Sequence, residues 1–345
     1  MTRLCRLCSL DILTMPKPFV HRMLTKFCAI LLSILCAFSA AAGENTIKGY
    51  RSVFKAGRDS SGNICIAIRH YAINTVTYFL LVNPCTLETS VAPAATLDFS
   101  GGIPADKLYD SPFVKALDRH TSPPFKLQNH GATHSDLPAE GLFLTVDMCP
   151  SKRPFERAFF ETVAGLARQN GQATPVAIAM TGAWLQHHEE ELAWIKREIH
   201  QRRLAVTWMN HSYNHSYDPK APLERNFLLS PDTDFEREVL ATEVLMLENG
   251  LIPSPFFRFP GLVADGNLLG KLRQLSLIPI GSDAWLAKGE NPKKGSFVLV
   301  HGNGNEPQGI VRVLPLLKQN NGPRLLPLRE AFASQGSGAT CNIKE

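Results

Sequence analysis

The segment Asn210-His211-Ser212-Tyr213-Asn214-His215 carries two histidines four residues apart, directly after an apolar run. Two imidazoles at this spacing share one face of a helical segment and can reach one metal ion. The preceding residues 204–209 are predicted to form a short buried strand. Ligands that follow a strand are typical of the carboxyl-terminal edge of a parallel sheet, where catalytic groups gather. Two solvated histidines on a polar turn would have the same spacing, so the other strand ends decide between these interpretations.

The rest of the chain alternates between predicted strands and helices. The strands are expected at 142–146, 174–181, 204–209, 256–259, 278–282, 297–300 and 324–327, and the helices at 153–168, 189–202, 233–251, 267–275, 308–318 and from 328. This alternation predicts an α/β fold with a parallel sheet, closed into a barrel or doubly wound. Further polar side chains follow the strands, namely Asp147, Arg258, Asp283 and His301. We therefore expect acids, histidines and an arginine at one rim.

The order of these motifs resembles the polysaccharide deacetylase superfamily (NodB homology, carbohydrate esterase family 4) over residues 138–330. The matching segments are Thr145-Val146-Asp147-Met148, Thr181-Gly182-Ala183-Trp184, His211-Ser212-Tyr213-Asn214-His215, Arg258-Phe259-Pro260-Gly261, Asp283-Ala284-Trp285 and Leu299-Val300-His301. The resemblance implies a distorted seven-stranded (β/α) barrel.

The resemblance also implies a metal-dependent hydrolase. His211 and His215 would hold a divalent metal, with zinc expected and cobalt or another transition metal as the alternative. Asp147 would be the general base, and His301 the general acid that protonates the leaving group.

Further roles follow from the same resemblance. Arg258 would orient Asp147 through a charge-assisted hydrogen bond. Asp283 would pair with the imidazolium form of His301. The substrate would contact Trp285, Leu299 and Pro260.

One position departs from the family pattern. The family's second aspartate, a metal ligand, is replaced here by Met148, and a thioether is a poor ligand for such an ion. Cys149 and Asp218 are candidate substitutes, although Cys149, as the next residue on a strand end, is expected to point elsewhere. The alternative is a catalytically degenerate, glycan-binding relative.

The N-terminus has the pattern of a secretory signal. A basic start at 23–26 precedes an apolar stretch at 27–38 and small residues at 39–43. The apolar stretch is short for a transmembrane helix. We expect an exported protein, periplasmic or secreted, that is cleaved near Ala42 and has no stable membrane span in its mature form; residues 1–22 look like an upstream extension.

Net charge and composition limit the classes of binding partner that we expect. The chain of 345 residues has a net charge of +5, but residues 1–42 hold five basic residues and one acidic residue, which leaves the rest near +1. No Lys/Arg-rich tract is present, so nucleic acid is an unexpected partner. The expected partner is an acetylated glycan or cell-envelope polysaccharide.

The remaining segments carry no chemistry that the sequence reveals. Residues 43–99 are predicted to be a small β-rich accessory region, with strands at 63–72 and 75–82 and a shorter one near 88–91. Residues 100–137 are rich in Gly, Pro, Asp and His and are predicted to be a linker or loop, in which His130 and His134 are solvated. Residues 331–345 are predicted to be a C-terminal tail.

Four cysteines follow residue 42, an even number that suits an oxidising compartment. Cys65 and Cys85 are roughly symmetric about Asn74-Thr75 and would face each other in a hairpin. Cys149 with Cys341 is a weaker pairing, reached by elimination.

Together these features predict an exported metal-dependent hydrolase that removes N- or O-linked acetyl groups from a glycan. A deacylase of small amides and a glycan-binding relative without activity are the alternatives.

Overall fold

The computed structural model describes residues 46–101, 103–319 and 322–333. The predicted signal segment, the tail from residue 334 and Cys341 lie outside the described residues. Among the helices that are described, none has the length and apolar character needed to cross a membrane.

The first described segment forms a four-stranded antiparallel sheet, which confirms the predicted β structure. Its strands, in sheet order, are β1 (Ile47–Arg58), β2 (Ile64–Ile73), β3 (Val76–Val82) and β4 (Thr89–Pro93), followed by the 3-10 helix η1 (Ala94–Thr96). A two-residue turn joins β2 to β3, and Asn74 in this turn has φ of 54°, a conformation that asparagine tolerates.

Residues 100–137, predicted as a linker or loop, instead contain two helices, α2 (Ala105–Tyr109) and α3 (Pro112–His120). The Ser111 side chain caps α3 by accepting a hydrogen bond from the backbone N–H of Val114, and Pro112 occupies the first helical position. Helix α3 buries an apolar face in the same core cluster as residues of the parallel sheet. Ser111 and Pro112, within the segment predicted as a loop, are therefore the start signals of a helix.

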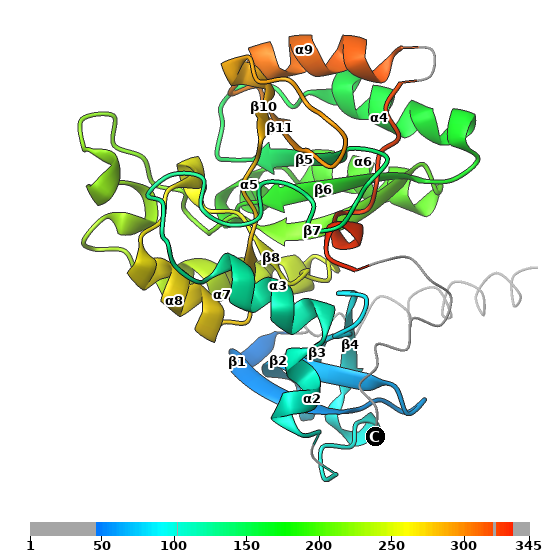
Figure 1. Cartoon of the computed structure of the whole chain (residues 1–345), viewed down its shortest axis with the longest axis vertical. Coiled ribbons are helices and arrows are strands. Elements are labelled where there is room, and N and C mark those ends of the chain that lie inside the picture. Colours follow the sequence, from blue (N-terminus) through cyan, green and yellow to red (C-terminus); the bar gives the residue numbers. More distant parts are fainter. Residues whose placement is uncertain (1–45, 102, 320–321, 334–345) are drawn as a thin grey trace, which may run out of the picture. The chain divides into compact units, whose positions relative to one another are not determined.

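A seven-stranded parallel sheet forms the second part of the fold and confirms the predicted α/β class and strand number (Figure 1). In sheet order the strands are β10 (Ala284–Trp285), β11 (Phe297–His301), β5 (Phe143–Met148), β6 (Thr174–Met180), β7 (Leu204–Asn210), β8 (Phe256–Phe257) and β9 (Ile278–Pro279). The end strands β10 and β9 are not paired with each other, so the barrel is half open. The strand predicted at 324–327 is reduced to one bridge between Leu142 and Leu325.

Helices connect these strands, most of them at the positions that the apolar periodicity predicted, whereas the helix at Gly182–His187 was not predicted. They are α4 (Arg157–Asn170), α5 (Gly182–His187), α6 (Glu189–His200), α7 (Phe235–Glu248), α8 (Gly266–Gln274) and α9 (Pro307–Leu317), with 3-10 helices η2 (Leu223–Arg225), η3 (Phe227–Leu229), η4 (Pro260–Leu262), η5 (Leu286–Lys288) and η6 (Leu328–Ala331). The side chains of Asp234 and Asp265 cap α7 and α8 by accepting backbone N–H groups.

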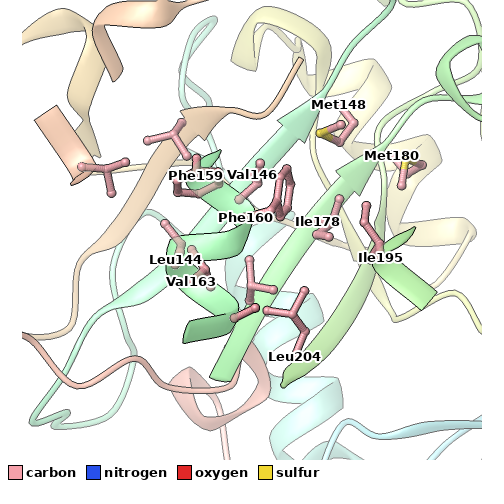
Figure 2. Close-up of a cluster of buried hydrophobic side chains, with 14 of the residues drawn as sticks. Leu144, Val146, Met148, Phe159, Phe160, Val163, Ile178, Met180, Ile195 and Leu204 are labelled. Atoms are coloured by element: carbon pink, nitrogen blue, oxygen red, sulfur yellow. The ribbon is translucent and has the colours of Figure 1, made fainter. Parts of the chain in front are cut away.

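Met148, the residue in place of the family's second aspartate, lies in the hydrophobic core and is fully buried. Figure 2 shows its side chain among those of Val146, Phe160 and other apolar residues. A Cβ added to Gly302 would meet the Met148 sulfur at 2.7 Å, so glycine is required there for close packing. Met148 thus packs the core and takes no part in the rim.

A buried ion pair joins the antiparallel sheet to helix α7. Arg69 on β2 donates from Nε to Glu243 Oε2 (2.6 Å) and from Nη2 to Glu243 Oε1 (2.9 Å), and both side chains are completely buried. The hydroxyl of Tyr50 donates a further bond to Glu243. All of the Glu243 charge is therefore neutralised by residues of the first sheet.

Both predicted disulfide pairings are wrong. Cys65 and Cys149 are buried free thiols, whereas Cys85 is disulfide-bonded to a cysteine other than these two. Cys65 lies on β2 with its side chain packed among apolar neighbours of the first sheet, so the hairpin symmetry did not determine the pairing.

Candidate functional site

The ends of two neighbouring strands bring the predicted base and acid together. In the register of β11 with β5, His301 is the partner of Asp147. Parallel neighbours end at the same edge of a sheet, so both side chains reach the same cavity, of about 470 Å³.

Arg258 holds Asp147 in place, as predicted. It donates from Nη1 to Asp147 Oδ1 (3.0 Å) and to the hydroxyl of Thr145 (2.9 Å). Its other nitrogens donate to the carbonyls of Ile280 and Gly281, and the guanidinium is fully buried. One oxygen of Asp147 is thereby fixed by charge-assisted bonding, and the other, Oδ2, lies 3.6 Å from His211 Nε2.

A backbone carbonyl fixes the orientation of the His211 ring. Its Nδ1 lies 2.8 Å from the carbonyl oxygen of Arg258. A carbonyl only accepts hydrogen bonds, so Nδ1 carries a proton and Nε2 is the nitrogen that faces the cavity.

The histidine motif is a bent loop and not the helical turn considered from its spacing. Ser212 and His215 have φ of 67° and 51°, in the left-handed region. Glu238 on α7 fixes the loop by accepting from the backbone N–H groups of Tyr213 and Asn214 at 2.8 Å each. The two imidazole rings end with their centroids 4.8 Å apart.

Cys149 lies beside these histidines, contrary to the expectation that it points elsewhere. Its sulfur is 3.5 Å from His211 Nε2, and one donor atom from each of Cys149, His211 and His215 lies within 4.8 Å of the other two. Side chains alternate along a strand, so residue 149 shares the face of residue 147 while Met148 faces the core. The other candidate substitute, Asp218, is exposed and accepts from the backbone of Lys220.

The charges around Cys149 favour its thiolate form. Burial raises the pKa of the Cys149 thiol, but the positive charges of neighbouring imidazoles lower it more, so the net pKa lies well below the ordinary value. These imidazoles belong to His215, His211 and His301.

One thiolate and two imidazoles form a donor set that suits zinc or a similar borderline ion. Three protein ligands with a cavity on the open side match the general form of a catalytic zinc site. The residues present therefore fit a bound transition metal, with Cys149 as the third ligand that the sequence comparison lacked.

Glu306, and not Asp283, is the carboxylate beside His301. The Glu306 Oε2 atom lies 2.9 Å from His301 Nδ1 and accepts a 2.7 Å hydrogen bond from Trp285 Nε1. The His301 contact has the distance of an ion pair without the alignment of a good hydrogen bond. Asp283 pairs with the predicted solvated His134 at 2.7 Å and accepts from the backbone N–H of Phe297.

The neighbours of His301 stabilise its charged form. Burial lowers the pKa of His301, but the Cys149 thiolate and the Glu306 carboxylate raise it more, to well above the ordinary value. His301 is therefore a proton donor at neutral pH. In the sequence, Glu306 follows His301 by five residues, directly after the turn-forming stretch 302–305. A carboxylate just after a turn that follows the histidine was the sequence signal that could have identified this pair.

The cavity wall contains two of the three predicted substrate contacts. Trp285 and Leu299 line it, whereas Pro260 is buried and its neighbours Gly261 and Leu262 line the cavity instead. The complete lining is Asp147, Cys149, Pro150, His211, Asn214, His215, Tyr217, Phe227, Gly261, Leu262, Trp285, Leu299, His301, Asn305 and Glu306.

A family model matches the first described part of the chain. Residues 48–100 match the family model described as the RP012 protein N-terminal domain. This range contains most of the four-stranded antiparallel sheet.

Solved structures with a similar fold are carbohydrate esterases of family 4 (CE4) and related proteins. One is a family 4 carbohydrate esterase from Bacillus anthracis, with 16% identity, a TM-score of 0.41 and coverage of 59% of this chain and 87% of the other. A chitin deacetylase from the fungal pathogen Colletotrichum lindemuthianum has 16% identity, a TM-score of 0.39 and coverage of 61% and 94%. A CE4 family pseudoenzyme from Bacillus anthracis has 14% identity, a TM-score of 0.38 and coverage of 60% and 70%. Such distant likeness is one of fold and carries no argument about activity.

Proposed function

We propose that this protein is an exported metal-dependent hydrolase that removes N- or O-linked acetyl groups from a glycan. The observation that carries the proposal is the convergence of Cys149, His211 and His215 beside an arginine-held aspartate and a charged histidine. A metal held by these three residues, expected to be zinc, would supply Lewis acidity toward the acetyl carbonyl and the attacking water.

The protein's own groups divide the proton transfers between them. Asp147, fixed through Oδ1 by Arg258, uses Oδ2 to take a proton from the attacking water. His301, which is protonated at neutral pH, gives its proton to the leaving amine or alcohol, and the acetyl group departs as acetate. Trp285 and Leu299 form an apolar wall of the cavity beside Asp147 and His301 and limit the access of bulk water.

His211→Ala is expected to remove metal and activity together, because the ring is the best-oriented ligand of the three. Metal content by mass spectrometry should fall below about one tenth of the wild-type stoichiometry, and acetate release from acetylated chito-oligosaccharides or peptidoglycan fragments should fall to the level reached with a chelator. The control is His200→Ala at the exposed end of α6, which should change neither. The proposed function would be refuted if the wild-type protein retained no metal and gained no turnover when metals were added.

Glu306→Gln is expected to lower kcat by about 10- to 100-fold with KM and metal content unchanged, because Glu306 acts by positioning and charging His301. Steady-state kinetics would separate the two parameters. Glu290→Gln is the matched control. The Glu290 carboxylate also contacts Trp285, because it accepts a hydrogen bond from the Trp285 backbone N–H, but Glu290 does not line the cavity. Equal losses in both variants would assign Glu306 a structural role only.

A second candidate function uses Cys149 as a nucleophile. The lowered thiol pKa and the proximity of His301 favour thiolate attack on the acetyl carbonyl, with the His301 proton passing to the leaving group and water later releasing acetate from the thioester. Activity that survives chelation, together with an acetyl adduct on Cys149 by mass spectrometry, would select this candidate.

A further inference from the structure

Two aromatic rings, Phe227 and Tyr217, extend from His215 to the rim of the cavity. The Phe227 ring meets the His215 ring edge-on, with centroids 5.7 Å apart and planes at 83°. Tyr217 stacks on Phe227 with centroids 5.1 Å apart and planes at 22°. Phe227 is buried, whereas Tyr217 is 60% exposed although it lines the cavity.

This pair of rings is held rigidly by the loop around it. The Asn226 side chain, almost fully buried, donates to the carbonyls of Asp218 and Ala221 and accepts from the backbone N–H groups of Asp218 and Phe227. Phe227 has φ of 51°, and a Cβ on Gly261 would meet its ring at 2.5 Å. A phenylalanine in this conformation against a glycine is tightly constrained, so Tyr217 rests on a fixed support.

The outer face of Tyr217 has no ring or cation packed on it from the described part of the chain, where its one ring contact is Phe227. Trp285, the other large aromatic residue of the lining, differs in this respect. Lys288 Nζ lies 3.6 Å from the centroid of the Trp285 ring, and the indole N–H is bound to Glu306. Tyr217 is thus the aromatic surface that remains available to a ligand.

We infer that Tyr217 is a stacking subsite for a pyranose ring of the substrate, a proposal that rests on the proposed function and deepens it. One face of a pyranose presents C–H groups that pack on an aromatic ring, while its hydroxyl groups need polar partners. The lining of the same cavity also contains Asn214 and Asn305, whose amide oxygens can accept hydrogen bonds from hydroxyl groups. Small acyclic amides have no such ring face, so a subsite here selects glycans over them.

Binding and turnover of defined probes test the subsite. Calorimetric titration with tetra-N-acetylchitotetraose, in the presence of a chelator, measures binding without turnover. Tyr217→Ala should weaken this binding about 3- to 10-fold, whereas Tyr217→Phe should remain within about twofold of the wild type, because the ring and its stacking are kept. With metal present, Tyr217→Ala should raise KM for the tetrasaccharide more than it raises KM for p-nitrophenyl acetate, which has no pyranose ring.

Tyr109→Ala is the matched control, since Tyr109 is 65% exposed on α2 and is not part of the cavity lining. Wild-type protein that binds the tetrasaccharide without turning it over would end the proposed function and leave the subsite standing. Unchanged binding by Tyr217→Ala, equal loss in the Tyr109 control, or no tetrasaccharide binding by the wild type would each overturn the subsite.

Discussion

Asp147→Asn is expected to lose acetate release by about 10²- to 10⁴-fold while it retains its metal. The amide has the shape of the carboxylate and can still accept from Arg258 Nη1 through its oxygen, so the site keeps its geometry. An amide cannot take up the proton of the attacking water. Single-turnover acetate release and metal analysis on the same preparation would measure both effects.

The control for this prediction is Asp218→Asn. Asp218 also follows the histidine motif, but it is exposed and lies outside the cavity lining, so neither metal content nor turnover should change. Activity within about tenfold of the wild type in Asp147→Asn would refute the assigned base. Loss of metal in Asp218→Asn would instead make Asp218 a ligand.

Cys149→Ala is expected to weaken metal binding by about 10²-fold or more and to lower activity in proportion to metal occupancy, because it removes the only sulfur donor of the described cluster. Cys149→Asp should recover metal and keep activity within about tenfold of the wild type, since a carboxylate is also a zinc ligand. Competition with a chromogenic chelator would give the affinities, and acetate release would give the activity.

Cys65→Ala is the matched control, since Cys65 is the other described free and buried thiol and lies on β2 in the core of the first sheet. It should alter neither affinity nor turnover. Metal-loaded but inactive Cys149→Asp would support the thiol nucleophile, because a bound metal would then not suffice for turnover. Metal affinity unaffected by Cys149→Ala would remove the cysteine from the coordination sphere altogether.

The sequence predicted the elements of the parallel sheet because each buried strand and amphipathic helix has a local apolar period. Residues Leu204 to Asn210, for example, differ by one residue from the predicted strand. The segment 100–137 was misread because its helices depend on tertiary burial of α3, which composition does not express. Strand ends also predicted that Asp147, His211 and His301 share one rim.

The sequence was a poorer guide to which side chains pair with each other at the rim. Glu306 reaches His301 because the turn after β11 folds back, and no periodic pattern encodes that return. Asp283 follows its strand as expected, but its carboxylate pairs with His134, which lies 149 residues earlier in the chain, and not with His301. Cys149 could have been placed correctly, because the alternation that points Asp147 into the cavity also points residue 149 there.

The ion pair between Arg69 and Glu243 has a consequence for where this protein can be divided. Glu243 shares helix α7 with Glu238, which holds the backbone of the histidine loop. Cutting the chain before residue 138 would remove both partners of the Glu243 carboxylate and would expose to water the apolar surface that the parallel sheet now buries against the first sheet and α3. The antiparallel sheet is therefore an integral part of the fold: the domain that contains the candidate site depends on it for the counter-charge of Glu243 and for the cover of its apolar surface.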